Sequence, residues 1–144
     1  MKKQILTLAT ILLLGFTTFA QNGMKNIQQL PQKAQEFVKT HFNDYKVAYV
    51  LTDKELADID YKIRFEDGTE IEFNAKGDWT DVSGKQNCIP TGFILKEITN
   101  YVNTYHNDLC ITDIEREFNR ITVELSNNLE IEFNSKGKLI SYDD

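Results

Sequence analysis

An internal repeat is the feature that most constrains how this chain can fold. Residues 70–77 (EIEFNAKG) recur as residues 130–137 (EIEFNSKG), with seven of eight positions identical at an offset of 60. Upstream, residues 37–44 and 101–108 share several positions at an offset of 64. Self-similarity at a fixed spacing indicates copies of one supersecondary unit. The chain is therefore expected to contain the same unit twice.

Each copy opens with an apolar residue followed by proline, at residues 30–31 and 89–90. These openings place the first copy at residues 30–83 and the second at residues 89–144. Residues 84–87 then form a short linker, and the two copies are expected to make one continuous domain.

An amphipathic helix is expected at the start of each copy, because apolar residues recur at i, i+4, i+7, i+8 and i+11. A proline near the start suits the first helical turn, where its missing N–H is not needed. The residues at these spacings are Leu30, Ala34, Phe37, Val38 and His41 in the first copy, and Ile94, Ile98, Tyr101, Val102 and Tyr105 in the second.

After each helix the apolar period changes to two, which predicts antiparallel strands with one solvated face. Residues 61–66 and 121–125 show this alternation, and a shorter strand is expected before each, around 46–51 and 111–115. A sheet face of this size must be covered by the helix. The predicted fold class is therefore α+β.

Turn chemistry predicts the strand register. If Phe65 faces Ile71, residues 67–69 form a three-residue loop in which Gly68 supplies a positive φ. The same counting gives the remaining pairs: Phe73 with Trp79, Leu125 with Ile131, and Phe133 with Leu139.

The polar face of this sheet is acidic. The predicted register places Glu66 opposite Glu70 and Glu124 opposite Glu132, and like charges in such positions destabilise a sheet by up to about 1 kcal/mol. One interpretation is a binding surface for a basic partner; the other is a charged face that resists aggregation. The candidate binding residues are Arg64 (placed opposite Glu72), Glu70, Glu72, Glu124, Glu130 and Glu132.

Residues 1–20 read as a secretory signal peptide. A basic start precedes an apolar run at residues 5–16, which is too short for a membrane span, and cleavage is expected near Ala20. Position 21 is Gln rather than Cys, so no lipid anchor is expected. Residues 21–29 form an N-terminal segment, and the mature protein is expected to be periplasmic or secreted.

Removing residues 1–20 takes away two lysines and no acid, so the net charge changes from −6 to −8. This balance argues against nucleic-acid binding, which depends on Lys and Arg. No second apolar stretch suggests a membrane anchor.

Cys88 and Cys110 are expected in an oxidising compartment, where a disulfide must be considered. A helix over residues 91–105 would separate its ends by about 22 Å, whereas a bridge needs Cα atoms within about 7 Å. Free or intermolecular thiols are therefore favoured, with an intrachain bridge as the alternative.

Other chemistry finds little support, and no catalytic residue, metal or cofactor is predicted. His41 lies on the apolar stripe of its helix and is expected to pack there, while His106 is expected to be solvated at a helix end. An acidic loop lacks the glycine and the spacing of a Ca²⁺ loop, so an ordinary solvated loop is favoured. Its acids are Asp53, Glu55, Asp58 and Asp60.

The hairpin sequences at residues 67–77 and 130–137, together with the proline-led helices and the second copy, resemble the PepSY-like secreted proteins of Bacteroidetes. That family has a fold similar to β-lactamase-inhibitor protein. The resemblance implies one long antiparallel sheet with the helices on one face, and suggests a role in binding or inhibiting exported proteins. The second copy departs from the pattern at residues 127–129, where Asn128 replaces a glycine but also tolerates positive φ.

The sequence thus predicts an exported, non-enzymatic module that binds a protein partner through its acidic sheet face, with inhibition as one form of that binding. The alternative is a periplasmic protein that binds a cation or small ligand. The oligomeric state is left open, because a sheet edge can pair with another chain.

Overall fold

A computed structural model describes residues 27–55 and 58–143. The predicted signal peptide and its cleavage site at Ala20 lie outside the described residues. Within the described part of the chain, no helix is long and apolar enough to cross a membrane.

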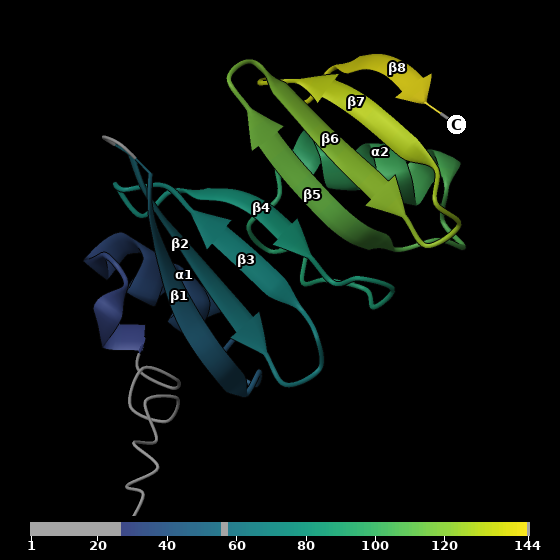
Figure 1. The fold of residues 1–144 in the computed structure, drawn as a ribbon. Helices are drawn as coiled ribbons and strands as arrows, with labels where there is room; N and C mark the ends of the chain where they lie inside the picture. The colour runs from purple at the N-terminus through teal and green to yellow at the C-terminus, as the bar shows by residue number, and fades with distance from the viewer. Residues whose placement is uncertain (1–26, 56–57, 144) are drawn as a thin grey trace, which may run out of the picture.

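The chain forms a helix and four strands, then a second helix and four strands (Figure 1). A short 3-10 helix, η1 (Ile27–Gln29), precedes the first of these groups. The first group comprises α1 (Gln32–His41), β1 (Val47–Glu55), β2 (Asp58–Phe65), β3 (Glu70–Phe73) and β4 (Trp79–Ser83). The second comprises α2 (Lys96–Tyr105), β5 (Ile111–Glu117), β6 (Arg120–Leu125), β7 (Glu130–Asn134) and β8 (Leu139–Asp143).

All eight strands belong to one antiparallel sheet in which neighbours in sequence are neighbours in space, from β1 at one edge to β8 at the other. Both helices lie behind this sheet in the view of Figure 1, α1 behind the first four strands and α2 behind the last four. The opposite face of the sheet is open. The predicted α+β fold class is confirmed.

The core lies between the helices and the sheet. Alternate strand residues such as Ile63, Phe73 and Phe133 are fully buried, and they meet the apolar stripes of α1 and α2. His41 takes part in this packing as predicted: its ring lies 5.0 Å from the ring of Phe37, centroid to centroid.

The helices begin later than the sequence suggested. Pro31 is the N-cap residue of α1, so the first proline does mark a helix start. The second helix begins only at Lys96, after the N-cap residue Leu95, which leaves Pro90 outside the helix. The residues before Leu95 are therefore free to follow another path.

This path explains why Cys88 and Cys110 form a disulfide, with Cα atoms 5.6 Å apart. The backbone N–H of Ile89 donates to the carbonyl of Ile111 at 2.9 Å, so the chain before α2 runs beside the start of β5. The prediction of free or intermolecular thiols was wrong because it assumed that the helix filled the whole interval between the cysteines.

The register of the first hairpin also differs from the prediction. Ile63, not Phe65, lies opposite Ile71, because Phe65 closes the loop by donating its N–H to the carbonyl of Thr69. Gly68, with φ +94°, therefore occupies the last position of the loop instead of the middle. The second group makes the same shift, so that Val123, not Leu125, faces Ile131.

The other predicted pairs are correct. Phe73 faces Trp79 and Phe133 faces Leu139, and the loop glycines of these hairpins, Gly77 and Gly137, have positive φ. Asn128 adopts φ 65°, so the predicted tolerance of Asn at this turn is confirmed.

The acidic segment at residues 53–60 is not an open loop. Asp53 lies on β1 directly opposite Asp60 on β2, and Glu55 is paired in the same way with Asp58. These residues extend a long hairpin, so the prediction of a loop was wrong, whereas Asp53 and Asp60 are solvent-exposed as predicted.

Candidate functional site

Two rows of mostly polar residues cross the open face of the sheet, with each residue directly opposite the next one on the neighbouring strand. The first row runs through Lys62, Glu72, Asp81, Glu115, Thr122, Glu132 and Ser141. The second row runs through Arg64, Glu70, Ser83, Asp113, Glu124, Glu130 and Asp143. Because each row crosses from β2 to β8, acids far apart in the sequence form one surface.

All six candidate binding residues lie in these two rows, but their pairing differs from the predicted one. Arg64 lies opposite Glu70, and Glu124 lies opposite Glu130. The predicted pairing of Glu66 with Glu70 was wrong, as was that of Glu124 with Glu132, because both hairpins are shifted by two residues.

Four of the six candidate binding residues, on β2, β3 and β7, form ion pairs. The Arg64 guanidinium lies 2.6 Å from Glu70, and Glu72 and Glu132 are paired with Lys62 and Arg120 at 2.6 and 3.0 Å. Glu70 also pairs with Lys85 at 3.0 Å. Burial raises the pKa of Glu70, but the Lys85 hydrogen bond and the nearby cations outweigh it, so the net pKa is lowered.

The centre of the first row is different, because Asp81 on β4 has an acid on each side. Glu72 lies opposite it on β3 and Glu115 on β5. Burial, followed by the charges of Glu72, Glu115 and Asp113, raises the pKa of Asp81 to about 6. Within the described residues, Asp81 belongs to no ion pair.

Sequence reasoning missed Asp81, Asp113 and Glu115. A bulge in β4 shifts the register after Phe73↔Trp79, so that Asp81 instead of Thr80 faces Glu72. The pairing of β4 with β5 is non-local and leaves no signal in either hairpin. Only the alternation of Asp113 and Glu115 around the buried Ile114 hinted at a polar face there.

The acidic character continues into the second half of the sheet. Burial, with the charges of Asp113 and Glu130, raises the pKa of Glu124. Burial, with the charges of Glu117 and Glu72, raises the pKa of Glu115. We call Asp81, Asp113, Glu115, Glu124 and Glu130 the central acidic patch. A cation placed nearby would stabilise the ionised form of each of these carboxylates.

An open polar depression of about 540 Å³ lies over the junction of β4 and β5. Six acids line it, namely Glu70, Glu72, Asp81, Asp113, Glu115 and Glu117, together with the cations Lys62, Lys85 and Arg116. Such a surface can accept Lys or Arg side chains of a partner. Within the described residues, no group of three or more His, Cys, Asp or Glu side chains is placed to hold a metal ion.

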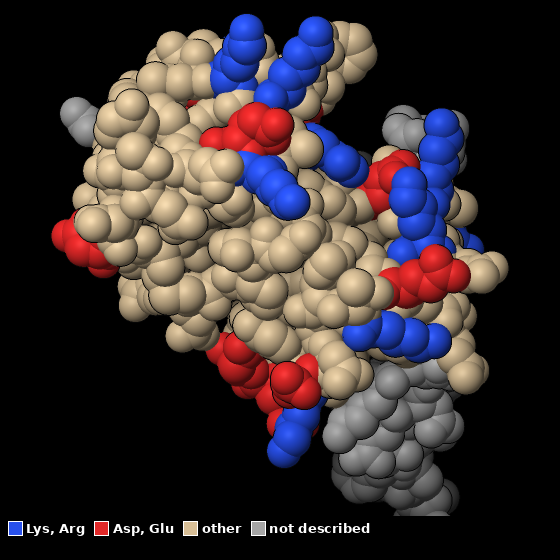
Figure 2. Space-filling model, turned by 180° about the vertical axis from the view of Figure 1, so that it is seen from behind, with Lys and Arg blue, Asp and Glu red and all other residues tan. Residues whose placement is uncertain are grey.

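The helix-bearing face has a different character. Figure 2 shows that uncharged residues fill much of this face, with the charged side chains mainly toward its rim. His106, expected to be solvated, is half-buried just after α2, where its Nε2 lies 3.3 Å from the hydroxyl oxygen of Tyr142.

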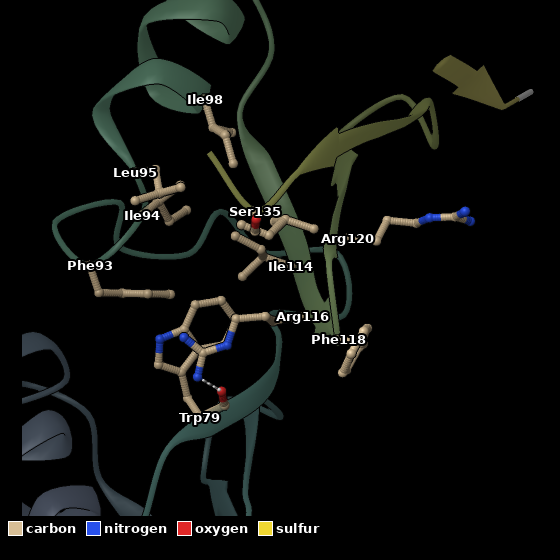
Figure 3. A pocket seen from close by; sticks show the side chains of 11 residues that line it. Trp79, Phe93, Ile94, Leu95, Ile98, Ile114, Arg116, Phe118, Arg120 and Ser135 are labelled. Atoms are coloured by element: carbon tan, nitrogen blue, oxygen red, sulfur yellow. Dashed lines mark hydrogen bonds between the residues drawn. The ribbon is translucent and has the colours of Figure 1, made fainter. Parts of the chain in front are cut away.

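A small apolar pocket of about 270 Å³ opens on this side, between the start of α2 and the β5–β6 hairpin (Figure 3). The Arg116 guanidinium lies 4.4 Å from the ring centroid of Trp79 and donates to its carbonyl oxygen at 2.6 Å. Phe93 and Ile98 contribute to the apolar wall. Arg116 is thus committed to holding Trp79 in place.

Comparisons with known proteins agree with this architecture. A family profile described as "Putative beta-lactamase-inhibitor-like, PepSY-like" matches residues 59–141. No curated protein matches the chain.

Three solved structures from Bacteroides are similar over most of the chain. A protein from Bacteroides thetaiotaomicron, described as "a putative calcium-regulated periplasmic protein", is 36% identical, with a TM-score of 0.79 over 83% of this chain and 94% of that one. A "putative periplasmic protein" from Bacteroides vulgatus is 38% identical, with a TM-score of 0.78 over 83% and 94%. A second from that organism, "of unknown function", is 32% identical, with a TM-score of 0.77 over 83% and 96%.

Proposed function

Because the chain belongs to the PepSY-like family, we propose that it is an exported, non-enzymatic module that binds a protein partner through the open acidic face of its sheet. The structurally similar proteins named above are described as periplasmic, and the chain begins with a predicted signal peptide. We therefore propose that the protein functions in the periplasm. N-terminal sequencing of the protein from the periplasmic fraction should begin at Gln21.

The observation that carries this proposal is the position of Asp81 between Glu72 and Glu115. Like charges facing one another across strands oppose folding, and burial adds to the cost of ionising Asp81. A cationic side chain of a basic partner would offset both costs by attracting the ionised carboxylates. The three facing acids are therefore more stable when a basic partner is bound than in the free protein.

The central acidic patch also has the geometry of a docking surface. Two continuous rows of side chains on a sheet give a partner many contacts on one rigid element. Complementary charge of this kind speeds encounter and fixes orientation more than it raises affinity. A partner of this face should thus carry clustered Lys or Arg residues.

Charge reversal within the patch tests the proposal. Glu115→Lys with Glu124→Lys is the preferred pair, since neither residue forms an ion pair within the described part of the chain and both substitutions relieve repulsion. Immobilised protein would be used to capture partners from an envelope extract of the native host. The double variant should capture at least about tenfold less partner than the wild-type protein does.

The matched control places the same charge change on the helix side. Glu36→Lys with Glu97→Lys alters exposed residues of α1 and α2 and should leave capture intact. Equal capture by wild-type protein and the patch variant would refute the proposal, as would equal loss in both variants.

Cation binding is the second candidate function, and one specific observation favours it: a relative 36% identical to this chain is described as calcium-regulated. A divalent cation near Asp81 would relieve the same repulsion, and it would have to bind with fewer than three carboxylate or imidazole ligands from the described residues. Millimolar Ca²⁺ should then raise the melting temperature of the wild-type protein but not of Asp81→Asn. A melting temperature that Ca²⁺ does not change would remove this candidate.

The repeat organisation is part of the proposal. Residues 30–83 and 89–144 are inferred to be two copies of one unit, supported by the sequence offset and by equivalent registers. Glu72↔Asp81 in the first group corresponds to Glu132↔Ser141 in the second.

A further inference from the structure

The two edges of the sheet carry the chain's exposed apolar strand residues. Leu51 on β1 is 52% exposed, and Ile140 and Tyr142 on β8 are 50% and 44% exposed. None of the described residues pairs with the outer side of β1 or of β8, which lie at opposite ends of the sheet (Figure 1). Edge strands of this kind present unpaired backbone N–H and C=O groups to other chains.

The chain itself contains a junction between the same two kinds of edge. β4 and β5 pair antiparallel at the centre of the sheet, with Val82 opposite Ile114. β8 is aligned on β7 as β4 is on β3: Ile131 faces Tyr142 as Ile71 faces Val82. The free side of β8 therefore corresponds to the side of β4 that pairs with β5.

The same correspondence holds for the other edge. β1 is aligned on β2 as β5 is on β6, because Val50 faces Ile63 as Ile114 faces Val123, and both strands have a register shift near their start. The free side of β1 corresponds to the side of β5 that pairs with β4.

Transferring the β4–β5 register to the two free edges gives a specific set of contacts. Tyr142 of one copy would face Val50 of the next, and Ser141 would face Leu51. The like-charged pair Asp81–Glu115 of the internal junction is thus replaced by a pair that brings no charge repulsion.

The third position of the transferred register places Asp143 opposite Tyr49. None of the three facing pairs therefore joins two like charges, in contrast to Asp81 and Glu115 at the internal junction.

We propose that copies of this chain associate head to tail, with β8 of one copy pairing antiparallel with β1 of the next. The interface is heterologous, so each added copy leaves one free edge of each kind. The association is independent of the acidic face, which stays accessible on every copy.

Single-edge variants test this arrangement. Leu51→Lys disables the β1 edge and Ile140→Lys disables the β8 edge; both residues are exposed, so the fold should persist, as thermal melting would verify. Sedimentation from micromolar to millimolar protein should show the mass of wild-type protein rising with concentration, while each variant alone stays monomeric. Asn103→Lys, on the exposed side of α2, is the control and should behave as wild type.

Mixing the two variants gives the decisive result. Each retains the edge that the other lacks, so an equimolar mixture should form a dimer and grow no further. A mixture that stays monomeric, or wild-type protein that stays monomeric throughout, would overturn the proposal. Self-association of Leu51→Lys alone would also overturn it, because it would show β8 pairing with β8.

Discussion

Replacing Asp81 with asparagine should stabilise the protein at neutral pH and leave its stability unchanged in acid. The pKa of Asp81 is raised from 3.8 to about 6, chiefly by burial and then by Glu72, Glu115 and Asp113. At about 1.4 kcal/mol per pKa unit, ionisation costs the folded state at most about 3 kcal/mol. Asp81 is only partly buried, and solvent screening reduces this to about 1–2 kcal/mol.

The sign follows from the direction of the shift. Below pH 3.8 Asp81 is protonated in both folded and unfolded states, so Asp and Asn are equivalent. Between pH 3.8 and about 6 only the unfolded chain ionises, and the wild-type protein loses stability as the pH rises. Above that range the whole cost is present, and the asparagine variant avoids it.

Thermal melting from pH 3 to pH 8 measures this difference. At neutral pH the variant should melt about 3–10 °C above wild type, and the gap should close as the pH falls toward 4. Asp108→Asn is the control, because it removes the same charge from an exposed position after α2. An equal gain from Asp108→Asn, or a gain from Asp81→Asn that does not change with pH, would refute the electrostatic reasoning.

Three further changes test the rest of the structure. Cys88→Ser with Cys110→Ser opens a ring with a sequence separation of 22 and should cost about 3 kcal/mol in urea unfolding; a loss below about 0.5 kcal/mol would contradict the bridge. Gly77→Ala should cost about 1–3 kcal/mol more than Gly68→Ala, since both have positive φ but only at Gly77 would a Cβ meet α1, 3.0 Å from the Ala34 nitrogen. Equal losses would show that the loop does not press on the helix. Asn128→Gly should gain about 0.5 kcal/mol by relieving φ 65°, and a loss would mean that its side chain is needed there.

Local patterns were enough to predict the elements of the fold. Alternation located the strands, and helical spacing identified the buried stripe, in which Ala34, Val38, Ile98 and Val102 do face the core. These signals work because the apolar period directly reports which side of an element is buried.

Predictions that depended on counting residues were less secure. Placing Gly68 in the middle of its loop instead of at the end moved the first hairpin by two positions, which kept each side chain on the correct face but changed its partner. The candidate residues were therefore placed on the right surface, while Arg64 was assigned the wrong acid. A shift by two preserves the face, and only a shift by one would exchange the two faces.

Features that join distant segments could not be obtained from local patterns. The pairing of β4 with β5, the bulge before Asp81 and the return of the chain from Cys88 to Cys110 all depend on tertiary contacts. Asp81 was missed for this reason, although it lies at the centre of the acidic face.

The β4–β5 junction is held by three paired residues on each strand, fewer than any other strand pair in the sheet. The two groups of strands are therefore joined by fewer paired residues than the strands within either group, with Asp81 and Glu115 facing each other across the junction. Both rows of polar residues cross this junction, and ionised Asp81 and Glu115 repel each other across it. A basic partner that contacted both Asp81 and Glu115 would replace this repulsion with attraction to both strands. Binding at the acidic face should therefore strengthen the connection between the two groups of strands.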